Sequence, residues 1–208
     1  ETLGSVVVTA RKWTEDPVEV PQSVTVVAER LVRDAGLRSV RDATLYVPNF
    51  NLVEFSARRL SFPFVRGIGS GQGDPAVATY VDGVPQITLN STNLPLLDVE
   101  RIEFLRGPHG ALYGRNTIGG VVHVFRKPPS NRLELDAGTS FGNFGLREYR
   151  ASFSTPLVED RLFLSLAGMH SERDGYTDND LTGNDVDFRD DWFGRGQLYW
   201  APDDQNEF

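Results

Sequence analysis

The sequence predicts an α+β domain followed by antiparallel strands of a transmembrane β-barrel, and three observations support this prediction. Up to residue 128, short helix signals alternate with short strands rich in β-branched and aromatic side chains. After Pro128–Pro129 the strands lengthen to about ten residues, in which apolar and polar side chains alternate. The charge changes at the same place, from 14 basic and 13 acidic side chains in residues 1–128 to 7 and 16 in residues 129–208. We therefore expect two regions that meet at this point.

Two short helices are predicted early in the chain. Residues 28–34 read AERLVRD, which favours a helix, and Gly36 suits the left-handed position that ends one. Ser39 and Asp42 have the spacing of a capping box, which predicts a second helix that ends before Pro48.

Short strands are predicted before and after these helices, and together they indicate a small mixed sheet. Pro, Gly or Asp residues bound each one, and Asp82–Gly83 is typical of a tight turn between two strands. The predicted strands are Val24–Val27, Phe64–Arg66, Ala78–Val81, Arg101–Leu105 and Val121–Phe125.

Four longer strands are predicted in the second region. Residues 133–141 place leucine, alanine, threonine and phenylalanine on one face and polar residues on the other. Strands of about ten residues match those that cross a bilayer at a tilt, and aromatic residues at their ends fit an interfacial girdle. A soluble β-sandwich or meander is the alternative, although its strands are usually about five or six residues long. The other three strands are predicted at 146–155, 162–171 and 191–200, with turns at 142–145 and 156–161.

The composition excludes several kinds of chemistry. The net charge is -8, and the acidic second region would repel phosphate, so no nucleic-acid partner is expected. The absence of cysteine excludes disulfides and thiolate metal sites. His109, His123 and His170 show no ligand-like spacing, and no pair of groups indicates acid–base catalysis, so we expect no resident metal, no cofactor and no enzymatic activity.

The polar stretch 172–191 contains eight acidic residues and two arginines. Residues 178–183 resemble the first half of an EF-hand loop, but the twelfth position is Arg189 instead of the glutamate that binds calcium through both oxygens. We expect a solvated loop here.

The stretch 104–127 reads FLRGPHGALYGRNTIGGVVHVFRK and is rich in glycine. A phosphate-binding loop is excluded because it requires a Gly-Lys pair, which this chain lacks. With LLDVERIE before it, this stretch resembles the end of the plug domain of TonB-dependent outer-membrane receptors. SVVVTA (5–10) resembles their TonB box, and VPQSVTVV (20–27), FVRGIGSG (64–71) and ATYVDGVPQ (78–86) resemble other plug motifs.

This resemblance implies a domain order. Residues 1–10 would carry the TonB box, residues 11–128 would form the plug, and residues 129–208 would begin a barrel that has 22 strands in the family. Only about four of those strands fit into the chain.

The resemblance also implies a function at the outer membrane of a Gram-negative bacterium, with the plug inside the barrel and the N-terminus in the periplasm. The receptor would import a scarce nutrient, most often a ferric siderophore, with energy from TonB, ExbB and ExbD, while lipid and lipopolysaccharide surround it. Cobalamin, haem and oligosaccharides are alternative cargoes, and any iron would belong to the cargo. A soluble glycine-rich binding module or enzyme is the alternative from another class.

Site residues follow from the matched motifs. The TonB-binding segment is short and β-prone, so it could pair with a strand of TonB at its edge. Two arginines before glycines and two glutamates nearby would fasten the plug to the barrel wall, because a buried guanidinium needs carboxylate partners. Polar loops at 69–74 and 86–93 would contact ligand. The TonB-binding residues are Ser5, Val6, Val7, Val8, Thr9 and Ala10; the plug–barrel residues are Arg66, Arg106, Glu100 and Glu103; the ligand residues are Ser70, Gln72, Asp74, Gln86, Thr88 and Asn90.

Overall fold

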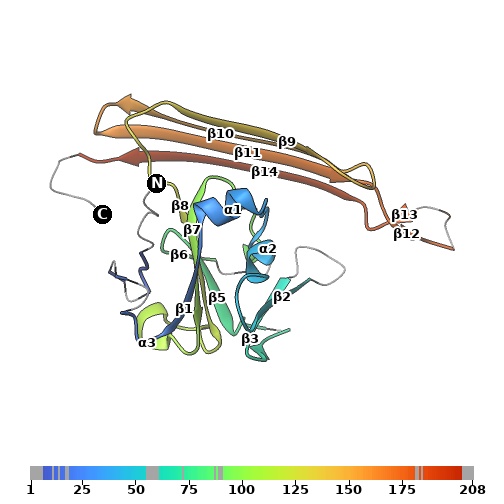
Figure 1. Cartoon of the computed structure of the whole chain (residues 1–208), viewed down its shortest axis with the longest axis horizontal. Helices are drawn as coiled ribbons and strands as arrows, with labels where there is room; N and C mark the ends of the chain where they lie inside the picture. The colour runs from blue at the N-terminus through green and yellow to red at the C-terminus, as the bar shows by residue number, and fades with distance from the viewer. Residues whose placement is uncertain are drawn as a thin grey trace. The chain divides into compact units, whose positions relative to one another are not determined.

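The structure is a computed structural model, shown in Figure 1, in which the chain divides into two compact units, Glu1–Lys127 and Pro128–Phe208. Each unit is described by itself. No helix in the described part of the chain is long and apolar enough to cross a membrane. The structure describes residues 7–10, 12–13, 15–16, 19–54, 61–71, 73–86, 88, 91–180, 183 and 185–202.

Unit 1 is built on a mixed sheet, as the sequence predicts, and this sheet has five strands. The strand order is β1-β7-β8-β5-β6, in which β5 and β8 are parallel and the other pairs are antiparallel. The Asp82–Gly83 turn joins β5 to β6, with both residues at positive φ (46° and 81°). The strands are β1 (Ser23–Ala28), β5 (Val77–Val81), β6 (Val84–Gln86), β7 (Val99–Arg106) and β8 (Gly120–Arg126).

A second, three-stranded sheet consists of β2 (Phe50–Glu54), β3 (Ser61–Val65) and β4 (Ile68–Gly69). The sequence predicted only the end of β3 and extended it to Arg66, which instead lies in the turn to β4 with φ 51°. Positive φ is unfavourable in a strand, so β3 ends one residue earlier.

Three short helices accompany these sheets: α1 (Glu29–Asp34), α2 (Val40–Thr44) and α3 (Gly110–Tyr113). The predicted capping box of α2 is present, since the Asp42 N–H donates to Ser39 Oγ (3.4 Å) and the Ser39 N–H donates to Asp42 Oδ2 (2.9 Å). Gly36 has the left-handed φ of 63° expected after α1. The sequence analysis did not predict α3, which lies within the glycine-rich stretch.

The five-stranded sheet buries apolar side chains on both faces, and β7 shows this alternation. Ile102 and Phe104 pack with residues of α1, α2 and β2 in one core. Leu105 points to the other face, where a second core joins it to Val8, Ala10, Tyr80 and Tyr113 among others. Residues at the N-terminal end of the chain therefore complete the second core.

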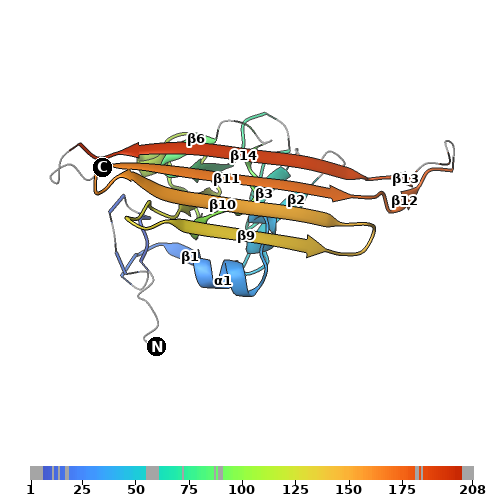
Figure 2. The ribbon, with the colours of Figure 1, turned by 90° about the horizontal axis from the view of Figure 1, so that it is seen from above.

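Unit 2 is an antiparallel meander of four long strands in the order β14-β11-β10-β9 (Figure 2). Alternate positions such as Leu135 and Trp192 are exposed on one face, as the sequence pattern predicts. A short hairpin, β12 (Thr177–Asp178) with β13 (Asp185–Val186), lies in the polar stretch between β11 and β14. The long strands are β9 (Glu134–Phe141), β10 (Arg147–Val158), β11 (Leu162–Arg173) and β14 (Arg189–Trp200).

The turn expected at 156–161 is shorter than predicted. Strand β10 continues through Pro156 to Val158, with a shift of pairing register between these two residues. Proline is accepted at such an irregularity, where the ladder does not need its missing N–H.

Candidate functional site

Val8, in the predicted TonB box, pairs with Glu15 against the five-stranded sheet of unit 1. Val8 and Glu15 exchange both backbone hydrogen bonds at 2.9 Å, and Lys12 takes a positive φ of 74° in the turn between them. We call the described residues 8–10, 12–13 and 15 the N-terminal hairpin. Val8 and Ala10 are fully buried in the second core. This end of the predicted box is therefore packed against the fold in this structure, whereas Ser5 and Val6 lie outside the described residues.

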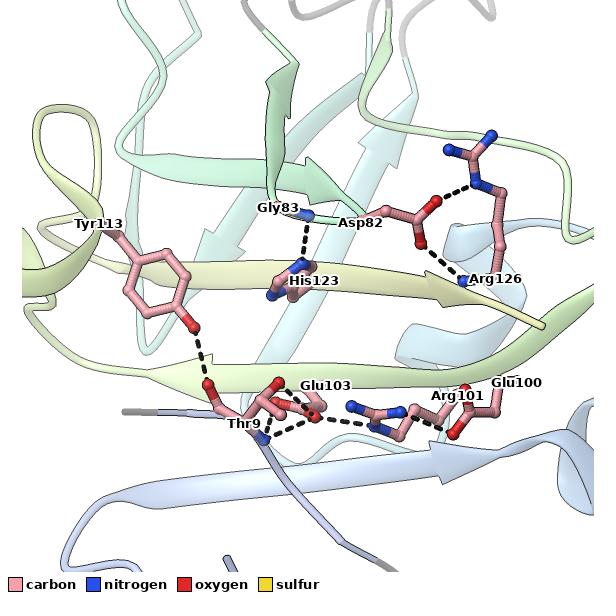
Figure 3. A network of polar contacts seen from close by, with 9 residues as sticks. All are labelled: Thr9, Asp82, Gly83, Glu100, Arg101, Glu103, Tyr113, His123 and Arg126. Carbon is pink, nitrogen blue, oxygen red and sulfur yellow. Dashed lines mark hydrogen bonds and ion pairs between the residues drawn. The ribbon is translucent and has the colours of Figure 1, made fainter. Parts of the chain in front are cut away.

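The N-terminal hairpin is held by the carboxylate of Glu103, a fully buried residue of β7 (Figure 3). The backbone N–H of Thr9 lies 2.9 Å from Oε1 and 3.1 Å from Oε2, and the Thr9 hydroxyl donates to Oε1 at 3.2 Å. Arg101 donates to the same Oε1 through Nε at 2.9 Å. Burial raises the pKa of Glu103, an effect opposed by these hydrogen bonds and by the charge of Arg101.

Glu100 contacts the other end of the Arg101 guanidinium, with Nη1 and Oε1 2.7 Å apart. Glu100 and Glu103, both predicted to face the barrel wall, thus share one arginine inside unit 1. Arg101 also lies over the ring of Phe125, with 3.8 Å from Cζ to the ring centroid. Whether Glu100 reaches the wall as well stays a prediction.

Two further polar side chains lie on the same sheet face. The Tyr113 hydroxyl donates to the Thr9 carbonyl at 3.4 Å. Burial, and to a smaller extent the negative charge of Glu103, raises the pKa of Tyr113 to about 12. His123 accepts the Gly83 N–H through Nε2 at 2.9 Å, and burial lowers its pKa to about 4. His123 is therefore neutral at physiological pH, with its proton on Nδ1, which has no hydrogen-bond partner among the described residues.

Arg66 and Arg106, the predicted plug–barrel arginines, have no ion-pair partner within the described part of the chain. Arg106 donates to the Pro48 carbonyl (3.0 Å) and to Thr25 Oγ1 (3.1 Å), and burial together with repulsion by Arg66 lowers its pKa. Within the described residues, the two positive charges thus lie near each other without a carboxylate ion-pair partner.

The two predicted ligand loops lie at the same end of the five-stranded sheet. The first loop leads into β5 at Val77 and the second leaves β6 at Gln86, and these antiparallel strands pair Thr79 with Gln86. Asp74 and Thr88 are exposed. Gln86 donates through Nε2 to the Val84 carbonyl at 3.3 Å, and the Thr88 hydroxyl lies 2.9 Å from that of Ser91. Ser70 precedes this exposed stretch, and Gln72 and Asn90 lie outside the described residues.

No metal-binding group was found around the EF-hand-like stretch or elsewhere in the described residues, where no three His, Cys, Asp or Glu side chains gather. Leu181 and Thr182 of that stretch lie outside the described residues.

The fold and these motifs define a receptor plug followed by barrel strands. Residues 16–121 match the family described as TonB-dependent Receptor Plug Domain, and the chain belongs to this family. The predicted fold class, a mixed-sheet plug with short helices followed by strands of an antiparallel barrel, is confirmed.

Individual relatives extend the similarity over both units. The pesticin receptor of Yersinia pestis is 32% identical over 97% of this chain, which covers 30% of that receptor. The vitamin B12 transporter BtuB of Vibrio vulnificus is 31% identical over 85% of this chain and 29% of its own. Among solved structures, the ferric yersiniabactin uptake receptor FyuA from Yersinia pestis has a TM-score of 0.81 at 30% identity, over 88% of this chain and 29% of its own. The chain thus spans about 30% of the length of these relatives.

The sequence analysis missed the contact between the N-terminal hairpin and Glu103. Its one signal was the alternation in VERIEFLR, which places Glu103 between Arg101 and Leu105 on a single strand face. A carboxylate at a buried strand position requires hydrogen-bond donors nearby. The sequence does not show that the donor comes from Thr9, 94 positions away.

Proposed function

We propose that this chain is the N-terminal part of an outer-membrane receptor that imports a ferric siderophore with energy supplied through TonB. The observation that carries the proposal is the similarity to the ferric yersiniabactin uptake receptor FyuA, which spans both units at a TM-score of 0.81. In this proposal, residues 5–10 bind TonB, which ExbB and ExbD energise, and the N-terminus lies in the periplasm. Outer-membrane lipid and lipopolysaccharide surround the barrel, and the iron enters only as part of the cargo.

The described residues support a ligand-binding role for one end of the five-stranded sheet. The loops that begin and end at β5 and β6 place Ser70, Asp74, Gln86 and Thr88 at one end, where polar side chains and backbone groups could bind a polar chelate. Arg66 and Arg106 would pair with carboxylates on the barrel wall, because burying a guanidinium with a carboxylate partner costs far less free energy than burying it alone.

Cobalamin is the second candidate cargo, since the vitamin B12 transporter BtuB of Vibrio vulnificus is 31% identical over 85% of this chain. Growth of a deletion strain complemented with the full-length receptor separates the candidates. Under iron limitation, we expect one or more members of a ferric siderophore panel to restore growth only when both the receptor and TonB are present. Growth that depends on the receptor with cobalamin, haem or an oligosaccharide, and with no siderophore, would refute the siderophore proposal.

A further inference from the structure

The contact between Glu103 and Thr9 joins two parts of the chain that the proposed function assigns to different tasks. Thr9 belongs to the predicted TonB-binding segment, whereas Glu103 lies on β7, three positions before Arg106. Because both carboxylate oxygens lie within hydrogen-bond distance of the Thr9 N–H, the segment is tied directly to the central part of the sheet (Figure 3). Tension on the segment would therefore be transmitted to this contact.

Several other described contacts of the N-terminal hairpin with the sheet are weaker or non-directional. Val8 and Ala10 bury small apolar side chains, and the Tyr113 hydroxyl reaches the Thr9 carbonyl at 3.4 Å. The Lys12 ammonium lies 4.2 Å from the centroid of the Tyr113 ring. Hydrogen bonds to an ionised carboxylate are roughly twice as strong as neutral ones, so Glu103 provides the strongest and most directional of these contacts.

We propose that Glu103 is the positioning residue that sets how readily residues 7–10 leave the plug, and hence the tension or binding energy that TonB must supply to withdraw them. This inference rests on the proposed function. Glu103 touches neither cargo nor TonB in this role; it acts through Thr9.

The chemistry of the covered sheet face makes this contact reversible. The polar groups that face Glu103 there are Thr9, Arg101, Tyr113 and His123, and they lie beside the apolar side chains of the second core. Withdrawal of the N-terminal hairpin would return a buried carboxylate and its guanidinium partner to water, which recovers hydration free energy lost on burial. A purely apolar contact would lack both this compensation and the fixed register that two hydrogen bonds impose.

Hydrogen exchange of the full-length receptor in nanodiscs tests the proposal, with Glu103→Gln as the variant and Glu100→Gln as its matched control. Both substitutions remove one negative charge beside Arg101, but only Glu103 contacts Thr9. In Glu103→Gln an NH₂ at the Oε2 position would face the Thr9 N–H instead of accepting from it, so we expect backbone exchange at residues 7–10 to accelerate about tenfold, the change that follows from losing one hydrogen bond. We expect Glu100→Gln to stay within about twofold of wild type.

A second variant and a second measurement separate the proposed role from a general structural one. Thr9→Val removes only the hydroxyl bond and keeps the N–H, so its exchange should lie between wild type and Glu103→Gln. The purified TonB C-terminal domain should bind Glu103→Gln more tightly than Glu100→Gln in the absence of cargo. The exchange of β7 and β8 amides should stay at the wild-type level in all three variants.

Three results would overturn the inference: equal exchange at residues 7–10 in the two glutamine variants, accelerated exchange throughout unit 1 in Glu103→Gln, or unchanged TonB affinity when exchange is faster. Failure of the TonB-binding part of the proposed function gives a different result, because the wild-type receptor would then not bind the TonB domain at all. Whether or not the receptor binds TonB, comparing exchange in Glu103→Gln and Glu100→Gln measures the contact between Glu103 and Thr9.

Discussion

Substitution of Gly120 by alanine should disrupt the end of the β7–β8 pair, whereas Gly110 in the same glycine-rich stretch should tolerate the same change. Gly120 is the first residue of β8 and pairs with Arg106. A Cβ at this position would lie 2.3 Å from the Leu105 carbonyl oxygen, roughly 1 Å inside ordinary van der Waals contact. The contact is with backbone, so relief requires the two strands to move apart.

The loss of stability expected for Gly120→Ala follows from this geometry. Overpacking of a tight site typically costs 1–3 kcal/mol, and a backbone clash between paired strands belongs near the upper end, about 3 kcal/mol. If exchange of the β7 and β8 amides proceeds through opening of this sheet, that loss corresponds to roughly 150-fold faster exchange, at 1.4 kcal/mol per factor of ten. The assay is hydrogen exchange of these two strands in the full-length receptor.

Gly110→Ala is the matched control, since an added Cβ there meets no heavy atom within 4 Å. Its exchange should equal that of wild type or be slightly slower, because alanine reduces the freedom of the unfolded chain. If exchange in Gly120→Ala stays within about fivefold of wild type, or if both variants change equally, the argument from close approach of the two strands is wrong.

Two further predictions concern His123 and Ser39. His123 has a pKa of about 4 in the folded chain and an ordinary value of 6.5, so the unfolded chain binds a proton first and stability falls as pH drops from 6.5 towards 4. The full difference of about 2.5 pKa units corresponds to roughly 3 kcal/mol, and His123→Asn, which keeps an acceptor for the Gly83 N–H, should lose this pH dependence in exchange of β5 and β8. An identical pH profile for the two proteins would contradict the assignment of His123 as the neutral group. Ser39→Ala removes one half of the α2 capping box and should destabilise that helix by about 1 kcal/mol, measured as roughly fivefold faster exchange at residues 40–47, with Asp42 still bonded to the residue 39 N–H. Unchanged exchange there would show that tertiary packing alone holds α2.

Local patterns predicted much of the fold. The capping box of α2 and the Asp82–Gly83 turn depend on neighbours within a few positions, and both are present. The alternating residues of the second region predicted four strands, which form an antiparallel meander. Strand β2 was missed because FNLVE is short and lacks clear alternation, so its place is fixed by pairing with β3.

The candidate site was harder to predict because its contacts join distant parts of the chain. The motif resemblance indicated Thr9 and Glu103 separately, as a TonB-binding residue and a wall contact. It did not show that the carboxylate of one accepts the N–H of the other. Arg106 was expected to bind a carboxylate, but in the described part of the chain it donates to the Pro48 carbonyl and the Thr25 hydroxyl. Pairing with the wall remains a prediction for Arg66 and Arg106.

The strand order of the plug sheet also constrains how this domain folds. Strand β1 pairs with β7, and β5 pairs in parallel with β8. Each of these early strands therefore pairs with a strand that is synthesised later. Folds dominated by such distant pairings have high contact order and fold slowly, because loop-closure entropy is lost before the contacts form. A chain that emerges from its N-terminus therefore cannot complete the five-stranded sheet until β7 and β8 are available. We expect completion of β8 at Arg126 to permit folding, and the N-terminal hairpin to close over the sheet as a late step.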